Sequence, residues 1–214
     1  MTTFQTPEPV AVTVEVLSGD VTVIAGDRSD TVVQVRPADA AKKADVRAAE
    51  QTVVDFTDGT LTVKTPRDWR THTPFGGNPT IEVTIEVPAG SRLTGSTGVG
   101  RLLGAGDLGP CDLEVSLGDI VVERPRGSVT AKVAKGDIRI GEAARGELRL
   151  ETSVGELEVG IRPGSAARLE VNAQQGTVQN LMQPVERPAD DENTVRVYAR
   201  SASGNVVIRH AVAA

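Results

Sequence analysis

Four acidic residues occupy the same place in repeated short segments of the chain, directly after a glycine, and could bind a metal ion. They are Asp20, Asp119, Asp137 and Glu156. Stacked segments would bring their carboxylates into a row, and Ca²⁺ prefers such oxygen ligands. However, the Gly-Gly-x-Gly-x-Asp pattern of calcium-binding repeats is absent, and aspartate is common in turns because its carboxylate accepts backbone N–H groups. No metal ion or other cofactor is therefore predicted. The residues predicted to form structural turns are Gly19, Gly100, Gly118, Asp119, Gly136, Asp137, Gly155 and Gly204.

The chain has one cysteine and two histidines, which could support nucleophilic catalysis. A nucleophilic cysteine needs exposure and a cationic or imidazole neighbour. Cys111 instead falls on an apolar strand register, level with Val129 and Leu148, and no motif places His72 or His210 beside it. We predict that Cys111 is a small buried side chain, and we assign no catalytic residue.

The segment 98–104, Gly-Val-Gly-Arg-Leu-Leu-Gly, is similar to a dinucleotide-binding loop. Such a loop leads from a strand into a helix whose N-terminus faces the pyrophosphate. Here another glycine-punctuated strand follows, and the spacing of the glycines has one residue too many. These glycines are therefore interpreted as turns of the repeat.

Charged side chains on outward strand positions could form a carbohydrate-active cluster, or could simply be solvated. They are Lys132, Arg139, Arg149 and Glu151.

Two further stretches are candidate interaction surfaces, because exposed aromatic and arginine side chains often anchor partners. One is the loop 65–79; the other is a weaker patch on a C-terminal strand. Their residues are Trp69, Arg70, His72 and Phe75 in the loop, and Arg196, Tyr198 and Arg200 in the patch. In the alternative interpretation, the loop docks on the domain's own end and Tyr198 packs beneath the N-terminal insertion.

The elements that must position these residues follow from a glycine repeat. Glycines recur at intervals of nine or ten, at positions 90, 100, 109, 118, 127, 136, 146, 155 and 164. Between them apolar and polar residues alternate, which is typical of half-buried strands. The sequence predicts an all-β protein, a β-solenoid or β-helix-like repeat of about 18 residues and two short strands per coil. An antiparallel meander or β-sandwich is the alternative.

The repeat is interrupted after Gly19, and we predict a single domain over 1–214 with three parts. Residues 1–26 form the first coil, 27–89 an insertion, and 90–214 the regular repeats. The insertion holds strands at 31–36, 52–56, 60–64 and 80–87. It also holds a short helix at about 39–51, with an acidic N-cap and an alanine-rich face that suits a cap over a solenoid end.

Composition limits the classes of partner. The chain has 214 residues, a net charge of -6 and scattered lysines and arginines, which argues against nucleic acid. The N-terminal residues have neither a basic region nor a long apolar stretch, and no segment is long and apolar enough to span a membrane. We therefore expect a cytoplasmic protein without direct membrane insertion.

Several stretches resemble one known family. They are Ser-Gly-Asp-Val-Thr-Val at 18–23, Ala-Asp-Val-Arg-Ala-Ala-Glu-Gln at 44–51, Asp-Gly-Thr-Leu-Thr-Val-Lys at 58–64, Val-Pro-Ala-Gly-Ser at 87–91 and the serial Gly-Asp-Ile corners. They resemble the bacterial β-strand-repeat family of unknown function labelled "putative adhesin", in its actinobacterial form. The resemblance covers most of the chain and implies a β-repeat fold and no catalytic residues.

The expected function is a non-enzymatic scaffold or binding module that contacts an unknown protein or polymer. The alternatives are a carbohydrate-active enzyme of β-helix type and a regulatory or envelope-stress interaction partner. An enzyme should have a cleft with converging titratable groups of perturbed pKa, whereas a scaffold should spread its charges over solvated strand faces.

Overall fold

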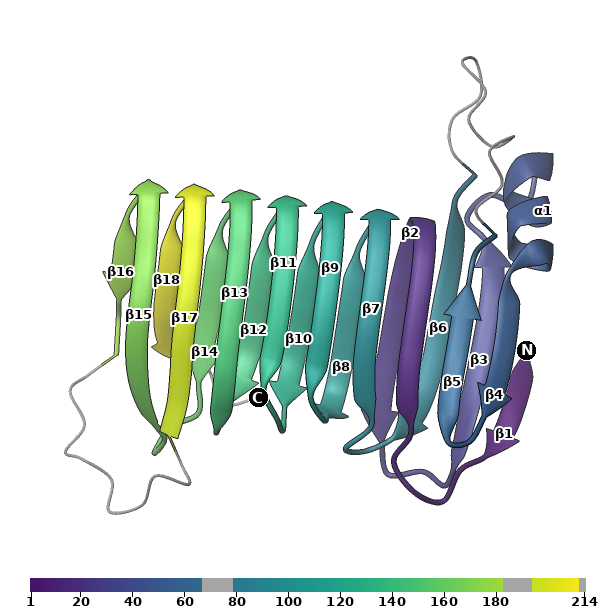
Figure 1. Cartoon of the computed structure of the whole chain (residues 1–214), viewed down its shortest axis with the longest axis horizontal. Helices are drawn as coiled ribbons and strands as arrows, with labels where there is room; N and C mark the ends of the chain where they lie inside the picture. The colour runs from purple at the N-terminus through teal and green to yellow at the C-terminus, as the bar shows by residue number, and fades with distance from the viewer. Residues whose placement is uncertain (67–78, 183–193, 212–214) are drawn as a thin grey trace.

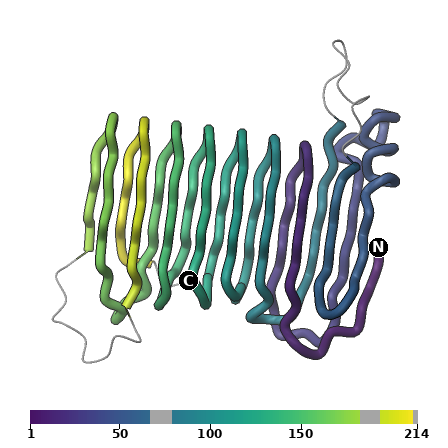
Figure 2. The backbone as a smooth tube through the Cα atoms, viewed as in Figure 1, coloured from purple at the N-terminus to yellow at the C-terminus, as the bar shows by residue number. Residues whose placement is uncertain are grey.

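Two β-sheets lie face to face in a flattened solenoid, described by a computed structural model for residues 1–66, 79–182 and 194–211 (Figures 1 and 2). We call the sheet nearer the viewer in Figure 1 the front sheet and the other the back sheet. Strand β2 (Ala11–Gly26) belongs to both, its first half to the front sheet and its second half to the back sheet.

Each of the other strands belongs to one sheet only. In spatial order, the front sheet contains β4 (Val53–Thr57), β5 (Thr60–Lys64), β2, β7 (Arg92–Val99), β9 (Cys111–Leu117), β11 (Val129–Lys135), β13 (Gly146–Val154), β17 (Thr194–Ser203) and β15 (Ala166–Gln175). The back sheet contains β1 (Thr2–Gln5), β3 (Asp30–Pro37), β6 (Ile81–Pro88), β2, β8 (Leu102–Leu108), β10 (Ile120–Pro125), β12 (Ile138–Ala143), β14 (Leu157–Ile161), β18 (Val206–His210) and β16 (Val178–Asn180).

Pairing within the repeats is parallel, because each strand bonds to its equivalent in the next coil. Val129 pairs with Cys111, 18 residues earlier, and with Leu148, 19 residues later. Sequence neighbours such as β9 and β10 lie in opposite sheets, so the antiparallel meander is excluded for this part of the chain. The all-β, solenoid-like architecture predicted from the sequence is confirmed.

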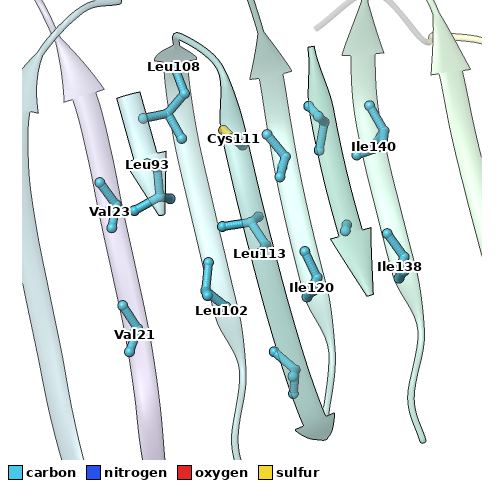
Figure 3. Packing of buried hydrophobic residues seen from close by; sticks show 14 of the residues in the cluster. Val21, Val23, Leu93, Leu102, Leu108, Cys111, Leu113, Ile120, Ile138 and Ile140 are labelled. Carbon is cyan, nitrogen blue, oxygen red and sulfur yellow. The ribbon is translucent and has the colours of Figure 1, made fainter. Parts of the chain in front are cut away.

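The core lies between the two sheets and consists of Val, Ile, Leu and Ala side chains. Alternate residues of each strand point inward, so like residues stack from coil to coil (Figure 3). The back-sheet row shows this stacking. Its members are Leu102, Ile120, Ile138, Leu157 and Val206, all of them fully buried. Small branched side chains suit such a thin core, since two strand layers leave little room for aromatic rings.

The spatial order of the coils differs from their order along the chain at both ends. The N-terminal strand β2 lies between the coil of β5 and β6 and the coil of β7 and β8. The last coil, β17 and β18, lies between the coil of β13 and β14 and that of β15 and β16. β2 therefore forms an internal coil, β1 lies at the outer edge beside β3, and the predicted insertion adds a further coil outside β2.

Antiparallel strands and a helix close the N-terminal end. β3 pairs with β6, β1 with β3, and β4 with β5, all antiparallel. The rings of Phe4 on β1 and Phe56 on β4 stack, with centroids 5.0 Å apart, and so join the two sheets at this end. The four strands predicted in the insertion are present within one residue of the expected bounds.

The helix is shorter than the predicted 39–51: α1 spans Lys43–Gln51. Asp39 forms a turn before it, where its carboxylate accepts the Ala41 N–H at 2.9 Å, and gives no N-cap. α1 contacts β3 and β6, and its buried Asp45 accepts the Thr80 backbone N–H at 3.0 Å. No helix in the described ranges has the length and apolar character needed to cross a bilayer.

Candidate functional site

A hollow of about 590 Å³ lies on the outward face of the front sheet, over β11, β13, β17 and β15. Strand alternation brings polar side chains to this face, since the intervening residues are in the core. Most of the lining groups are charged or polar, and one is aromatic. The residues that matter below are Lys132, Arg149, Glu151, Glu170, Tyr198 and Arg200.

Parallel register arranges these side chains in two rows that cross the four strands. In one row Arg149 lies opposite Tyr198, and Tyr198 lies opposite Glu170. In the other row the order is Lys132, Glu151, Arg200 and Asn172. Opposite charges alternate along the second row, so each charged group has a neighbour of the opposite sign on the adjacent strand, an arrangement that stabilises a sheet.

Tyr198 lines the hollow and packs against Arg149. The guanidinium carbon of Arg149 lies 5.3 Å from the centroid of the Tyr198 ring, within the range of a cation–π contact. The Nε of Arg149 also donates a hydrogen bond to Glu147, which raises the pKa of Arg149. The result is a preformed surface of one ring and one permanent positive charge.

Two more hollows continue this surface along β17. One, of about 520 Å³, lies near the start of the strand and is lined by Arg126, Arg145, Arg196 and Glu147 among others. The other, of about 220 Å³, lies near its end and is lined by Arg200, Asn172 and Gln174 among others. We call the three hollows together the β17 strip. Arg196, Tyr198 and Arg200 are successive outward residues of β17, so the strip follows one rigid strand.

The structure thus brings together residues that the sequence suggested separately. Lys132, Arg149 and Glu151 surround Tyr198 and Arg200. Arg139 does not join them, because β12 belongs to the back sheet; there its Nε donates to Glu158 at 2.6 Å. Burial disfavours the charged form of Glu158, but hydrogen bonds from Arg209 and Arg139 outweigh it and hold its pKa below the usual range. Trp69, Arg70, His72 and Phe75 lie outside the described residues.

The acidic residues at the corners bond to the backbone of the next coil. The carboxylate of Asp119 accepts the Asp137 N–H at 3.0 Å, and that of Asp137 accepts the Glu156 N–H at 2.7 Å. Asp20 does the same for Arg101 at 2.9 Å. Within the described residues, no group of three or more His, Cys, Asp or Glu side chains could hold a metal ion.

Removing one of these carboxylates should therefore have a modest, metal-independent effect. Asp137→Ala is expected to lower the free energy of unfolding by about 1 kcal/mol, the usual net value of one such hydrogen bond. Asp137→Asn keeps the acceptor, as Asn205 does in bonding to the Thr177 N–H at 3.0 Å, and should remain close to wild type. Urea unfolding with and without a chelator checks this; a chelator-dependent loss would contradict it.

Cys111 is buried between Leu93 and Val129 in the core. Burial raises the pKa of its thiol to about 12, so the nucleophilic thiolate is scarce at neutral pH. His210 lies at the end of β18, in the other sheet, and His72 is outside the described residues. Gly98 and Gly104 lie within strands β7 and β8, and no helix follows them, so 98–104 is not a dinucleotide loop.

The fold and this surface define a class: a two-layer, largely parallel β-repeat protein with an open polar hollow on one face. No family model matches the chain, and no curated protein matches it. Among solved structures, it is similar to a "putative cell adhesion protein" from Clostridium sporogenes, with 14% identity, 98% of each chain covered and a TM-score of 0.52.

Two other solved structures are similar at lower scores. A "putative adhesin" from Bacteroides fragilis has 12% identity, covers 97% of this chain and 95% of its own, and gives a TM-score of 0.42. A "putative lipid binding protein" from Parabacteroides distasonis has 12% identity, coverages of 99% and 94%, and a TM-score of 0.33. The similarity to the Clostridium sporogenes protein, at 14% identity and a TM-score of 0.52, concerns the fold alone. The adhesin description is shared by several of these structures, and the actinobacterial form remains a prediction.

Proposed function

We propose that the protein is a non-enzymatic binding module whose β17 strip holds an extended, anionic polysaccharide. The observation that carries this proposal is the position of Tyr198, the only tyrosine of the chain, against Arg149 in the middle of an otherwise polar strip. An aromatic ring can pack on the C–H face of a sugar, while the surrounding polar groups bond to its hydroxyls.

The charges of the strip support an anionic ligand. Arg126, Arg145 and Arg196 surround the hollow at one end, with Glu147 as the acidic member. Lys132, Arg149 and Arg200 outnumber Glu151 and Glu170 in the central hollow. The whole chain has a net charge of -6, so this excess of positive charge is local and would concentrate an acidic polymer here. Arginine suits carboxylate and sulfate groups because its planar donors bind them in pairs.

The shape of the strip supports an extended ligand that is bound and not chemically converted. From residue 196 to residue 202 the strand rises about 20 Å, which is the length of several sugar units. The strip is an open strand face, and its carboxylates Glu151 and Glu170 lie beside basic or aromatic neighbours in the two rows. The buried Cys111 thiol takes no part. Backbone pairing on both sides of β17 keeps the surface rigid, so little ordering is needed on binding.

Tyr198→Ala and Arg200→Ala are expected to weaken binding to acidic polysaccharides at least about tenfold, because aromatic and arginine side chains contribute most of the binding energy at such surfaces. Isothermal titration calorimetry against an acidic and a neutral polysaccharide measures this. Arg92→Ala is the matched control: Arg92 is exposed on β7, in the same sheet but away from the strip, and its loss should change affinity less than about twofold.

Raising the salt concentration should weaken wild-type binding, since the attraction is partly between exposed charges. Equal losses in Tyr198→Ala and Arg92→Ala would contradict the proposal, as would tighter binding to the neutral polymer. A loss confined to Trp69→Ala would move the binding surface to the segment 65–79.

A further inference from the structure

The end of the solenoid opposite α1 exposes a long strand edge. β15 is the last strand of the front sheet, has ten residues, and pairs only with β17 among the described residues. The edge strands at the other end are shorter, with four residues in β1 and five in β4. Proteins usually shorten, cover or disrupt exposed edges, because unpaired N–H and C=O groups bond readily to another strand.

The core is also open at this end. Leu169 and Val171 point inward on β15 but are only partly buried, whereas their partners on β17, Val197 and Ala199, are 1% and 0% exposed. In the same terminal coil, Val178 is 48% exposed and Leu181 is 60% exposed. A strand added beside β15 would therefore satisfy backbone groups and cover apolar side chains together.

The direction of the free backbone groups follows from the equivalent strands of the stack. The Cys111 N–H on β9 donates to the carbonyl of Ser128 at 3.0 Å, so Cys111 bonds toward β11, the next strand of the stack. Leu169 is in register with Cys111 through Val197, Leu148 and Val129. Since bonding direction alternates along a strand, Leu169 and its odd-numbered neighbours direct their N–H and C=O groups to the free edge.

The even-numbered residues between them, Arg168 and Glu170, are complementary to themselves in antiparallel pairing. With Leu169 on a two-fold axis, Arg168 lies opposite Glu170 of a second copy, and Glu170 opposite its Arg168. Shifting the strands by one allowed step in either direction would instead place Glu170 opposite Glu170, or Arg168 opposite Arg168. Opposite charges across strands stabilise a pair and like charges destabilise it, so the charges select one register.

We propose that the protein forms a tail-to-tail dimer in which β15 pairs antiparallel with β15 of a second copy, in the register that places Leu169 opposite Leu169. About six backbone hydrogen bonds join the strands between residues 167 and 171. On the inner side Ala167 meets Val171, so the two cores become continuous. On the outer side two Arg168–Glu170 pairs form; within the described part of each copy, neither residue has an ion-pair partner.

Charge reversal tests the register through the oligomeric state, measured by sedimentation velocity over a dilution series. Wild type should be dimeric. Arg168→Glu places two carboxylates opposite each other at both contacts of the dimer, and Glu170→Arg places two guanidinium groups opposite each other there. Each single variant should weaken the dimer by about tenfold or more, and the double variant should restore it. Glu114→Arg, on the outward face of β9 in the same sheet, is the control and should leave the dimer unchanged.

Mixing the two single variants gives an outcome that misfolding cannot produce. The Arg168→Glu copy carries acidic groups at both positions and the Glu170→Arg copy carries basic groups at both, so each contact between them joins one acidic and one basic side chain. The variants should therefore associate with each other more tightly than either does with itself.

Three results would overturn the proposal. They are a monomeric wild type, a dimer that resists both charge reversals, and a mixture of the single variants that remains monomeric.

Discussion

Valine in place of Gly136 is expected to prevent folding, or to lower the free energy of unfolding by at least about 4 kcal/mol. Gly136 has φ of +144°, a conformation that side chains with a Cβ rarely adopt. A Cβ there would lie 1.9 Å from the carbonyl oxygen of Gly118. That oxygen belongs to the backbone of the preceding coil, so it cannot move without breaking the stack.

The same geometry recurs at the glycines that precede the acidic corner residues, which is why the glycine rather than the acidic residue after it is essential. Gly118→Val should behave like Gly136→Val, because its Cβ would lie 2.0 Å from the oxygen of Gly100. Two controls separate the causes. Gly164 has φ of +89° but open space around it, so Gly164→Ala tests backbone strain alone. Gly26→Ala tests neither effect and should be neutral.

Urea unfolding followed by circular dichroism measures these differences. The expected order of destabilisation is Gly136→Val first, Asp137→Ala well below it, and Gly26→Ala last. Equal losses in Gly136→Val and Asp137→Ala would contradict the steric explanation.

Ile138→Ala is expected to lower the free energy of unfolding by about 3 kcal/mol, the second-largest effect on stability. Ile138 is fully buried and stacks between Ile120 and Leu157 in the back-sheet row. Truncation would leave a cavity between the two sheets. The backbone pairing within each sheet limits how far the neighbouring side chains can move to fill that cavity.

Val178 provides the comparison, since it continues the same row beside Val206 at the open end. It is 48% exposed, so Val178→Ala should cost less than about 1 kcal/mol. Denaturant titration of both variants measures whether the loss of unfolding free energy falls from the middle of the stack to its open end. A larger loss at Val178 than at Ile138 would show that the core is not organised around the centre of the stack.

The repeat and its inward register were predictable because they depend on local pattern. Glycine spacing and apolar alternation identified the strands, and placed Cys111 level with Val129 and Leu148, as observed. The order of the coils was not predictable. Equivalent repeats offer nearly equal stacking surfaces, so the sequence alone does not reveal that β17 lies between β13 and β15.

That order is what creates the candidate site. In chain order, β17 would be the outermost strand and Tyr198 would have no neighbour on β13. Insertion of β17 beside β13 places Tyr198 against Arg149 and joins Arg200 to Glu151 and Lys132. The alternation of apolar and polar residues identifies the outward residues of each strand separately. Which of them are neighbours across strands depends on the long-range pairing register. The cytoplasmic location and the role of Trp69 stay predictions.

Binding at the β17 strip is most directly tested through Tyr198 itself. Because it is the only tyrosine in the chain, its ring resonances in an NMR spectrum report on one position without further assignment. Titration with an acidic polysaccharide should shift these resonances in a saturable manner, and the neutral polysaccharide should shift them little. Saturable binding of the acidic polymer, detected by calorimetry in the same sample, with no change at the Tyr198 ring would contradict the account.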